Sequence, residues 1–335
     1  MTLNKLLERL LHLVPVLLGV SIIVFLMITL TPGDPVEIML GDQQVTPEQV
    51  ETMRRDMGLD RPLHERFGVF LLNAVQGEFG LSFFHRRPVS EVIAERLPAT
   101  IELSLVALLI ALVTAIPLGV LAAVKKNTIL DRIATVGSLL GVSMPGFWFG
   151  ILLIMLFAVH LQVLPVSGRI GYAAEVPAIT HLLLIDTLLV GRLDSFLDAL
   201  AHIILPAITL ALPMAAILMR VTRSSMLEVL RADYITFAEA KGLSRARILG
   251  RHALKNALIP TVTVAALETG SLLGGNMIVE TVFGWPGLGR LVVESIFARN
   301  YPLVQAAVLL YAVTYVLLNF FADILYTVLN PRVRL

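Results

Sequence analysis

The residues of this 335-residue chain that are suited to chemistry are few, and their spacing excludes several enzyme classes. Gly284, Gly287 and Gly289 form a glycine-rich segment, but no Gly-Lys dipeptide occurs, which excludes a nucleotide-binding phosphate loop. The seven histidines include no pair spaced by three or four residues, so a helical metal site has no support. No G-x-S-x-G serine motif is present. We therefore expect a non-catalytic protein that binds no metal or cofactor and does not hydrolyse ATP by itself.

The composition indicates a membrane protein. Hydrophobic residues make up 57% of the chain and charged residues 15%, against about 45–50% and about 25% in an ordinary soluble domain. The formal net charge of +1 provides no basic field for nucleic acid, which we exclude as a partner. The chain has no cysteine, which excludes disulfides, thiolate nucleophiles and zinc–thiolate sites.

Six apolar runs are long enough to cross a bilayer as helices, which requires about 20 residues. Five of them contain no Asp, Glu, Lys or Arg, and the sixth contains only Glu268. They predict an all-α membrane protein in which residues 1–335 form a single transmembrane domain. The predicted spans are residues 10–31, 103–124, 133–159, 199–219, 257–279 and 303–322. A shorter run, 176–190, contains Asp186 and predicts an interfacial segment instead.

The distribution of basic residues predicts that the N-terminus and the C-terminus are both cytoplasmic. In that orientation 15 Lys and Arg fall in 64 inside residues, against 11 in 131 outside residues. Residues 32–97 then form an extracytoplasmic loop with short helices, which opens on the helix-breaking cluster Thr31–Pro35. Thr46–Gln49 predicts the start of a polar helix that Gly58 ends, and Phe67–Ala74 predicts an apolar segment on the membrane surface or against the bundle.

The predicted inside segment 220–256 is long and strongly basic, with eight Lys and Arg against three acids. Apolar residues between Met226 and Lys241 recur at spacings of three and four, which predicts that they share one helix face, and Gly242 predicts a turn before a second helix. One interpretation is a basic loop that rests on anionic lipid. The other is a docking element for a partner protein.

Helix-breaking and polar residues inside the predicted spans indicate a solute pathway. Non-helical backbone at membrane depth is tolerated where it is buried in protein or lines a water-filled cavity. Glu268 lies near the centre of a span, where a carboxylate costs at least about 2.5 kcal/mol and should face the bundle interior or a wet cavity. Helix packing alone is the alternative explanation. We expect the translocation pathway to include Ser143, Met144, Pro145, Trp148, Glu268, Gly274 and Asn276.

Several segments resemble the permease subunits of bacterial ATP-binding-cassette (ABC) importers. Residues Tyr234–Ser244, followed by His252–Pro260, resemble the EAA loop of these permeases in its peptide-permease form. The likeness covers nearly the whole chain and is greatest to the first permease subunit of the dipeptide and oligopeptide importers. The other similar segments are Thr31–Pro35, Leu97–Leu103, Ser143–Pro145, Leu164–Gly168, Thr222–Glu228, Glu280–Gly289 and Asn330–Arg332.

The resemblance implies the type I ABC importer permease fold, in a multi-pass protein of the bacterial inner membrane that translocates dipeptides or short peptides into the cytoplasm by alternating access. It also implies a heterodimer with a second homologous permease, two cytoplasmic ATPase subunits that bind ATP and Mg, and a periplasmic peptide-binding protein, with membrane lipid around the helices. The residues it implies for ATPase coupling are Asp233, Tyr234, Thr236, Phe237, Ala238, Glu239, Ala240, Lys241, Gly242, Leu243 and Arg245.

The chain departs from the family pattern at three positions. Thr236 stands where the name-giving Glu of the loop would fall, Asn300 where Asp is usual, and Glu268 where Gln is common. The change at Glu268 leads to the hypothesis of a pH-sensitive pathway. Two other functions remain open: an autonomous channel or ion-coupled carrier, which Glu268 and the broken spans favour, and a membrane receptor whose outside loop binds a ligand. The sequence does not separate dipeptides from longer peptides, nickel complexes or haem.

Overall fold

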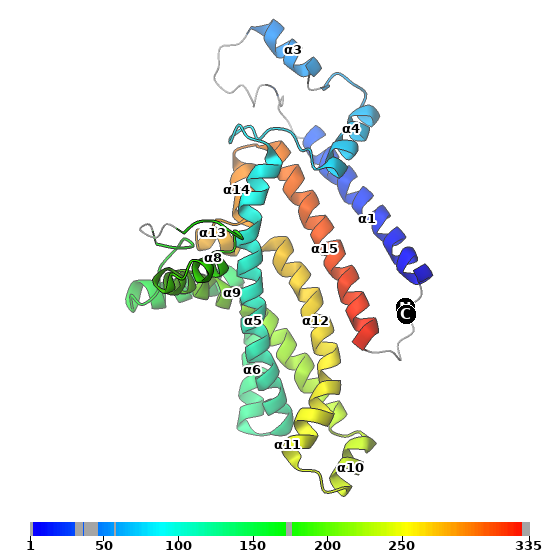
Figure 1. Cartoon of the computed structure of the whole chain (residues 1–335), viewed down its shortest axis with the longest axis vertical. Helices are drawn as coiled ribbons and strands as arrows, with labels where there is room; N and C mark the ends of the chain where they lie inside the picture. Colours follow the sequence, from blue (N-terminus) through cyan, green and yellow to red (C-terminus); the bar gives the residue numbers. More distant parts are fainter. Residues whose placement is uncertain (1–2, 31–35, 37–45, 57, 172–175, 330–335) are drawn as a thin grey trace. The chain divides into compact units, whose positions relative to one another are not determined.

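The computed structural model describes residues 3–30, 36, 46–56, 58–171 and 176–329 (Figure 1). Over these residues the chain is built from helices, with a single isolated β-bridge between Leu81 and Pro88. The predicted breaker cluster Thr31–Pro35 and the segment Asn330–Arg332 lie outside the described residues. The chain divides into two compact units: Met1–Leu97 with Arg290–Val313, and Pro98–Gly289 with Thr314–Leu335.

The first unit holds the amino-terminal helices together with parts of later ones. Its elements are α1 (Leu3–Thr29), α3 (Pro47–Asp56), α4 (Leu63–Gln76), the start of α5 (Val89–Val124), most of α14 (Leu288–Phe297) and the start of α15 (Tyr301–Leu329). Asn300 is buried just before α15, where its side-chain amide donates to the Ser82 hydroxyl at 2.6 Å and its carbonyl accepts from the Phe83 N–H at 3.2 Å.

Helix α3 confirms the predicted start signal. The Gln49 N–H donates to the Thr46 hydroxyl at 3.4 Å, and the Thr46 N–H donates to the Gln49 side-chain oxygen at 3.0 Å. This reciprocal pair is a capping box, which satisfies backbone donors that a helix start leaves without partners. Helix α4 uses one side to pack Phe67 and Phe70 on Phe25 of α1, with ring centroids 5.4 and 5.8 Å from the Phe25 ring.

The second unit contains the remaining helices, and α9 is its organising element. Its elements are the rest of α5, α6 (Ile129–Ser143), α7 (Gly146–Leu153), η1 (Ile154–His160), α8 (Leu183–Leu189), α9 (Leu193–Val229), α10 (Asp233–Ala240), α11 (Arg245–Arg247), η2 (Ile248–Ala253), α12 (Leu254–Gly275), α13 (Met277–Val282) and the end of α15. Helix α9 packs against α6, α7, α8 and α12.

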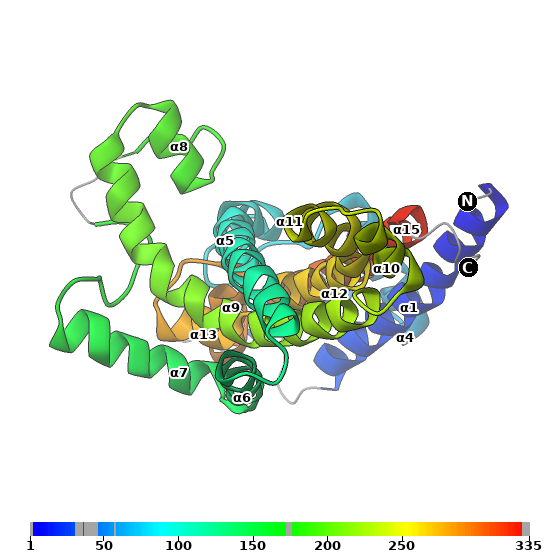
Figure 2. The same cartoon turned by 90° about the horizontal axis from the view of Figure 1, so that it is seen from below.

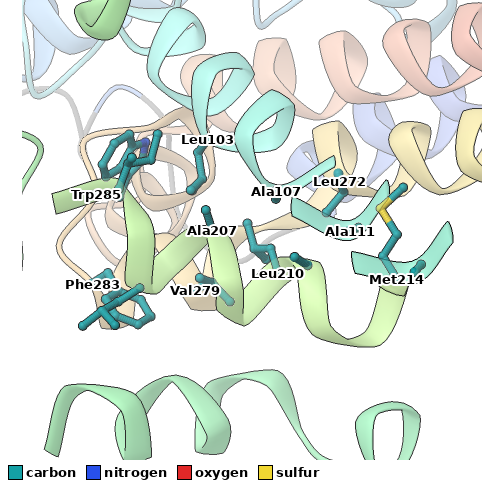
Figure 3. Packing of buried hydrophobic residues seen from close by; sticks show 14 of the residues in the cluster. Leu103, Ala107, Ala111, Ala207, Leu210, Met214, Leu272, Val279, Phe283 and Trp285 are labelled. Atoms are coloured by element: carbon teal, nitrogen blue, oxygen red, sulfur yellow. The ribbon is translucent and has the colours of Figure 1, made fainter. Parts of the chain in front are cut away.

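The largest buried cluster of the second unit joins α5, α9, α12 and the segment after α13 (Figure 3). Leu103, Ala107 and Ala111 follow one another every four residues on α5, so they lie on one face of that helix. The small side chains of Ala107 and Ala111 allow close approach of the neighbouring helices, where Leu210 and Leu272 pack in the same cluster.

The predicted span 133–159 is not one straight helix. Helices α6 and α7 are bent by 106° at Met144 and Pro145, and a π-helix continues α7 to His160 (Figure 2). Met144 is extended, with ψ 131°, because the ring of a following proline disfavours the helical conformation. The break lies at Met144 and Pro145, two of the residues predicted for the pathway, but the sequence did not predict the size of the bend.

The membrane-capable helices of the described chain number four, or five when the bent pair counts as one span. They cover Val89–Val124, Leu193–Val229, Arg245–Leu273 and Tyr301–Thr327, with Ile129–Ser143 and Gly146–His160 as the bent pair. In α1 the apolar stretch is shorter, Leu13–Met27. The protein is therefore a mostly helical membrane protein with several candidate spans.

Candidate coupling and pathway sites

The predicted coupling loop is anchored to the rest of its unit by one face of α10. Ile235 and Ala238 are three residues apart, and both are buried in a cluster with Met226, Ile248 and Ala253. Met226 belongs to the end of α9, while Ile248 and Ala253 belong to η2, which leads into α12. The buried face of α10 therefore packs against both the end of α9 and the helical segment that leads into α12.

The opposite face of α10 presents aromatic side chains to the outside. Phe237 is 62% exposed, and the Lys241 ammonium lies 4.5 Å from the centroid of its ring. The Tyr234 hydroxyl accepts a hydrogen bond from the Asn256 amide at 2.9 Å. Of the other predicted coupling residues, Ala238 is buried and Leu243 is half-buried. The rest are exposed: Asp233, Thr236, Glu239, Ala240, Gly242 and Arg245.

The prediction that residues from Met226 to Lys241 share one helix face is wrong. Helix α9 ends at Val229, and Ala232 is extended with ψ 144° before α10 begins. The break reorients the chain, so Met226 is buried while Phe237 is exposed. The predicted turn is confirmed: Gly242 has φ +73°, its N–H donates to the Glu239 carbonyl at 2.9 Å, and α11 follows.

The predicted pathway residues lie on different elements of the second unit. Ser143, Met144 and Pro145 form the bend between α6 and α7, and exposed Trp148 lies one turn further on. Glu268 is half-buried in α12.

Two further residues predicted for the pathway mark the end of α12. Gly274 lies in its last turn, and Asn276 follows the helix. The Asn276 side chain is buried, and its amide donates to the Leu272 carbonyl and to the Ser104 hydroxyl of α5, the latter at 3.4 Å. Asn276 thus fixes the end of α12 to α5.

A buried polar cluster that sequence reasoning missed surrounds Glu280. This side chain is fully buried, and its carboxylate accepts a hydrogen bond from the Thr100 hydroxyl at 2.7 Å. The same hydroxyl accepts from the Leu288 N–H at 2.8 Å, and the Trp285 indole N–H donates to the Ala99 carbonyl at 2.9 Å. The segment after α13 therefore folds over residues 98–100 of α5.

A second missed carboxylate joins a further segment to α5. Arg169 donates to Glu102 through Nε at 3.1 Å and Nη2 at 2.7 Å, and the Leu184 N–H donates to the other oxygen of Glu102 at 2.7 Å. The Gly168 N–H donates to the Phe283 carbonyl at 3.1 Å. Three segments quoted for the family resemblance, 97–103, 164–168 and 280–289, are thus brought together.

A second ion pair joins α6 and α9 near the coupling loop. Arg223 of α9 donates to the Asp131 carboxylate of α6 at 2.6 Å through Nε and 2.9 Å through Nη2, and the Asn127 N–H adds a bond at 2.9 Å. The neighbouring Thr222 hydroxyl lies 3.0 Å from the Thr261 hydroxyl of α12. These contacts join α6, α9 and α12. They involve Thr222 and Arg223 of α9, close in sequence to Met226, which packs against α10.

Comparison with known protein families identifies the class of membrane protein to which this chain belongs. Residues 115–335 match the family described as "Binding-protein-dependent transport system inner membrane component", and residues 2–104 match the family for the N-terminal part of such a membrane component. The chain belongs to this family. With its membrane-capable helices it is a multi-pass inner membrane component of a transport system.

The relatives are similar over their whole length. The dipeptide transport system permease protein DppB of Escherichia coli (strain K12) is 44% identical over 335 residues, 99% of each chain. The di/tripeptide transport system permease protein DppB of Pseudomonas aeruginosa (strain UCBPP-PA14) is 46% identical over 327 residues, 98% of this chain and 97% of the relative. The glutathione transport system permease protein GsiC of Escherichia coli (strain K12) is 39% identical over 332 residues, 99% of each chain.

Proposed function

We propose that this chain is a permease subunit of an ABC importer that translocates dipeptides, or other short peptides, from the periplasm to the cytoplasm. The observation that carries the proposal is the 44% and 46% identity, across nearly the full length, to permeases named for dipeptide and di/tripeptide transport. The chain pairs with a second homologous permease, two cytoplasmic ATPase subunits that bind ATP and Mg, and a periplasmic peptide-binding protein.

The proposed ATPase contact is the exposed face of α10 with the turn at Gly242. Phe237 inserts into an apolar recess of the ATPase subunit, because a large exposed aromatic side chain gains most from burial at an interface. Lys241 and Arg245 form the polar rim of this contact. Movement of the ATPase then reaches α9 and α12 through the buried face of α10, where Ile235 and Ala238 lie. Alternating access follows from the rocking of these helices.

The proposed topology is six spans with both termini in the cytoplasm, residues 32–97 outside and residues 220–256 inside. The absence of cysteine from the chain makes this directly measurable with single-cysteine variants. Glu48 in α3 and Glu239 in α10 are both exposed positions. A membrane-impermeant maleimide should label Glu48→Cys in intact spheroplasts and Glu239→Cys only after permeabilisation. The reverse labelling pattern would contradict this topology and would place residues 32–97 inside and residues 220–256 outside.

The proposed pathway includes the bend at Ser143–Pro145, Trp148, Glu268 and the end of α12 with Gly274 and Asn276. The site should bind peptide weakly, because tight binding would retain the solute. Exposed Ser143 and Trp148 suit single-cysteine labelling. A dipeptide should slow labelling at these positions, while labelling at exposed Glu48 of α3 should be unaffected. Equal labelling rates with and without dipeptide would exclude Ser143 and Trp148 from the path.

The function is tested by uptake in proteoliposomes that contain this chain with its partner subunits and binding protein. We expect ATP-dependent uptake of a labelled dipeptide that requires the ATPase subunits. Uptake that persists without them would favour an ion-coupled carrier and contradict the proposal. Competition by unlabelled dipeptide, tripeptide and glutathione then ranks the cargo, since relatives are named for each class. ATP hydrolysis without peptide uptake would assign the importer a different solute.

A further inference from the structure

A cavity of about 320 Å³ in the first unit is not used by the proposed transport function. It is lined by the end of α1 at Thr29, by one side of α4, and by the start of α15 at Tyr301. Helix α15 is long and apolar enough to cross a membrane, and Tyr301 is its first residue. A spanning helix begins near one membrane surface, so the proposed topology, on which this inference rests, places the cavity at the level of the lipid headgroups.

Two arginines and no acid line this cavity. Arg61 precedes α4, and Arg66 lies in its first turns beside Asn73, seven residues further along the same helix face. Within the described part of the chain, neither guanidinium has a hydrogen-bond or ion-pair partner. Each presents a planar set of donors that matches a phosphate or carboxylate group. Asn73 and Gln305 of α15 add neutral donors to the same space.

The cavity adjoins an apolar surface that can hold a hydrocarbon chain. Val69 and Phe70 of α4 line it together with Phe25 of α1. Val69 is also the first residue of an exposed apolar stripe that continues along α4 through Leu72 to Val75, which is 82% exposed. The spacing of three residues keeps these side chains on one face of the helix. A cationic subsite that suits an anion thus lies directly beside an apolar stripe that the described residues leave exposed.

We propose that this cavity binds the phosphate of an anionic phospholipid, with Arg61 and Arg66 on the phosphate and an acyl chain along Val69, Leu72 and Val75. A free anion would use the arginines but leave the apolar stripe uncovered. A lipid uses both, since guanidinium–phosphate pairs are strong and burial of an acyl chain removes apolar surface from water. The lipid then holds α1, α4 and the start of α15 together at the membrane surface.

The test measures phosphatidylglycerol binding by native mass spectrometry of the complex purified with its partner subunits. Arg66→Gln and Arg61→Gln should each weaken binding at least about tenfold, which corresponds to about 1.4 kcal/mol. Arg55→Gln is the matched control, because Arg55 lies in the same loop, on exposed α3, and does not line the cavity. Arg66→Lys should retain part of the binding, because it keeps the positive charge.

Each outcome supports or overturns the lipid assignment. Loss of phosphatidylglycerol in the two glutamine variants, with binding kept in Arg55→Gln, supports it. Equal binding in all variants overturns it. Displacement of the lipid by millimolar inorganic phosphate would make the cavity a free-anion site, and displacement by a dipeptide would make it a substrate site. Both results contradict the assignment, whereas the transport proposal is judged separately by peptide uptake.

Discussion

Gly287 lies so close to Glu280 that a Cβ added at Gly287 would overlap the Glu280 carboxylate. The carboxylate is fully buried and held by Thr100, so it has little room to withdraw. The absence of a side chain at Gly287 therefore allows the segment after α13 to close over the start of α5. Gly287 and Gly289 thus have a packing role, since a Cβ at either position would meet an atom within 3.0 Å.

Gly287→Ala should lower the unfolding free energy of the protein by about 1–3 kcal/mol, as overpacking of a buried site does. Thermal unfolding of the purified protein in detergent measures this change. Gly137→Ala on α6 is the control, because a Cβ there meets no atom within 4 Å. That variant should be neutral or stabilising, since Ala is a better helix former than Gly. Equal unfolding temperatures for both variants would contradict the close contact.

Glu102 and Arg169 should behave as a coupled pair. Glu102→Ala removes the carboxylate from the half-buried guanidinium and leaves it only the His181 carbonyl, and Arg169→Ala leaves a buried carboxylate without its counter-charge. The Arg169 side chain is 18% exposed and that of Glu102 is 6% exposed, so each change should cost about 2–4 kcal/mol, somewhat less than a fully buried pair. The double variant should lose less than the sum of the single variants. Additive losses in thermal unfolding would show that the two residues act independently.

The region around α8 should open when it is acidified. Burial alone would raise the pKa of Asp186, but hydrogen bonds from the Thr180 hydroxyl and N–H and from the Ile179 N–H outweigh it and hold the pKa below its ordinary value of 3.8. A lowered folded-state pKa gives stability that is present above the ordinary value and lost as the pH falls through the folded one.

We therefore expect hydrogen exchange in residues 176–190 to remain slow and unchanged from pH 7 to pH 5, after correction for the intrinsic exchange rate, and to accelerate below about pH 4. Asp186→Asn should exchange faster at neutral pH and show no acid-dependent step. An acid step of equal size in Asp186→Asn would assign the transition to another group.

Gly242→Val should reduce coupling without filling any occupied space. A Cβ at Gly242 meets no atom within 4 Å, so the cost arises from φ +73°, which disfavours L side chains by about 1–2 kcal/mol. Gly250→Ala is the matched control, because Gly250 is also open but does not have positive φ. We expect Gly242→Val to lower the yield of co-purified ATPase several-fold and Gly250→Ala to leave it unchanged. Equal yields would show that the turn is not part of the interface.

Local signals predicted local structure well. Thr46 and Gln49 mark a helix start that depends on residues three apart, and both capping bonds are present. Pro145 marked the break in the span 133–159, because proline restricts its own neighbours. The 106° angle depends on what α7 packs against, including α9 and α13, and so it could not be predicted from that segment alone.

Long-range polar pairs were not predicted. Thr100 and Glu280 are 180 positions apart, and nothing in the local pattern of either residue indicates the other. The available signal was that Glu102 immediately precedes one apolar run and Glu280 immediately follows another, so both carboxylates stand at the boundaries of predicted spans. The prediction of one helix face from Met226 to Lys241 failed because the apolar spacing of three and four residues continues across Leu230–Ala232. The helix itself is broken there, between the end of α9 and the start of α10.

The most direct test of the account compares two substitutions on opposite faces of α10. Phe237→Ala removes an exposed ring, so the fold should remain stable, while ATP-dependent dipeptide uptake and ATPase association should be lost. Ile235→Ala removes a buried side chain and should instead lower stability by about 2–5 kcal/mol. The measurement is dipeptide uptake in proteoliposomes with the full set of partners, beside thermal unfolding of each variant. Full uptake by stable Phe237→Ala would contradict the claim that this chain imports peptides through an ATPase docked on α10.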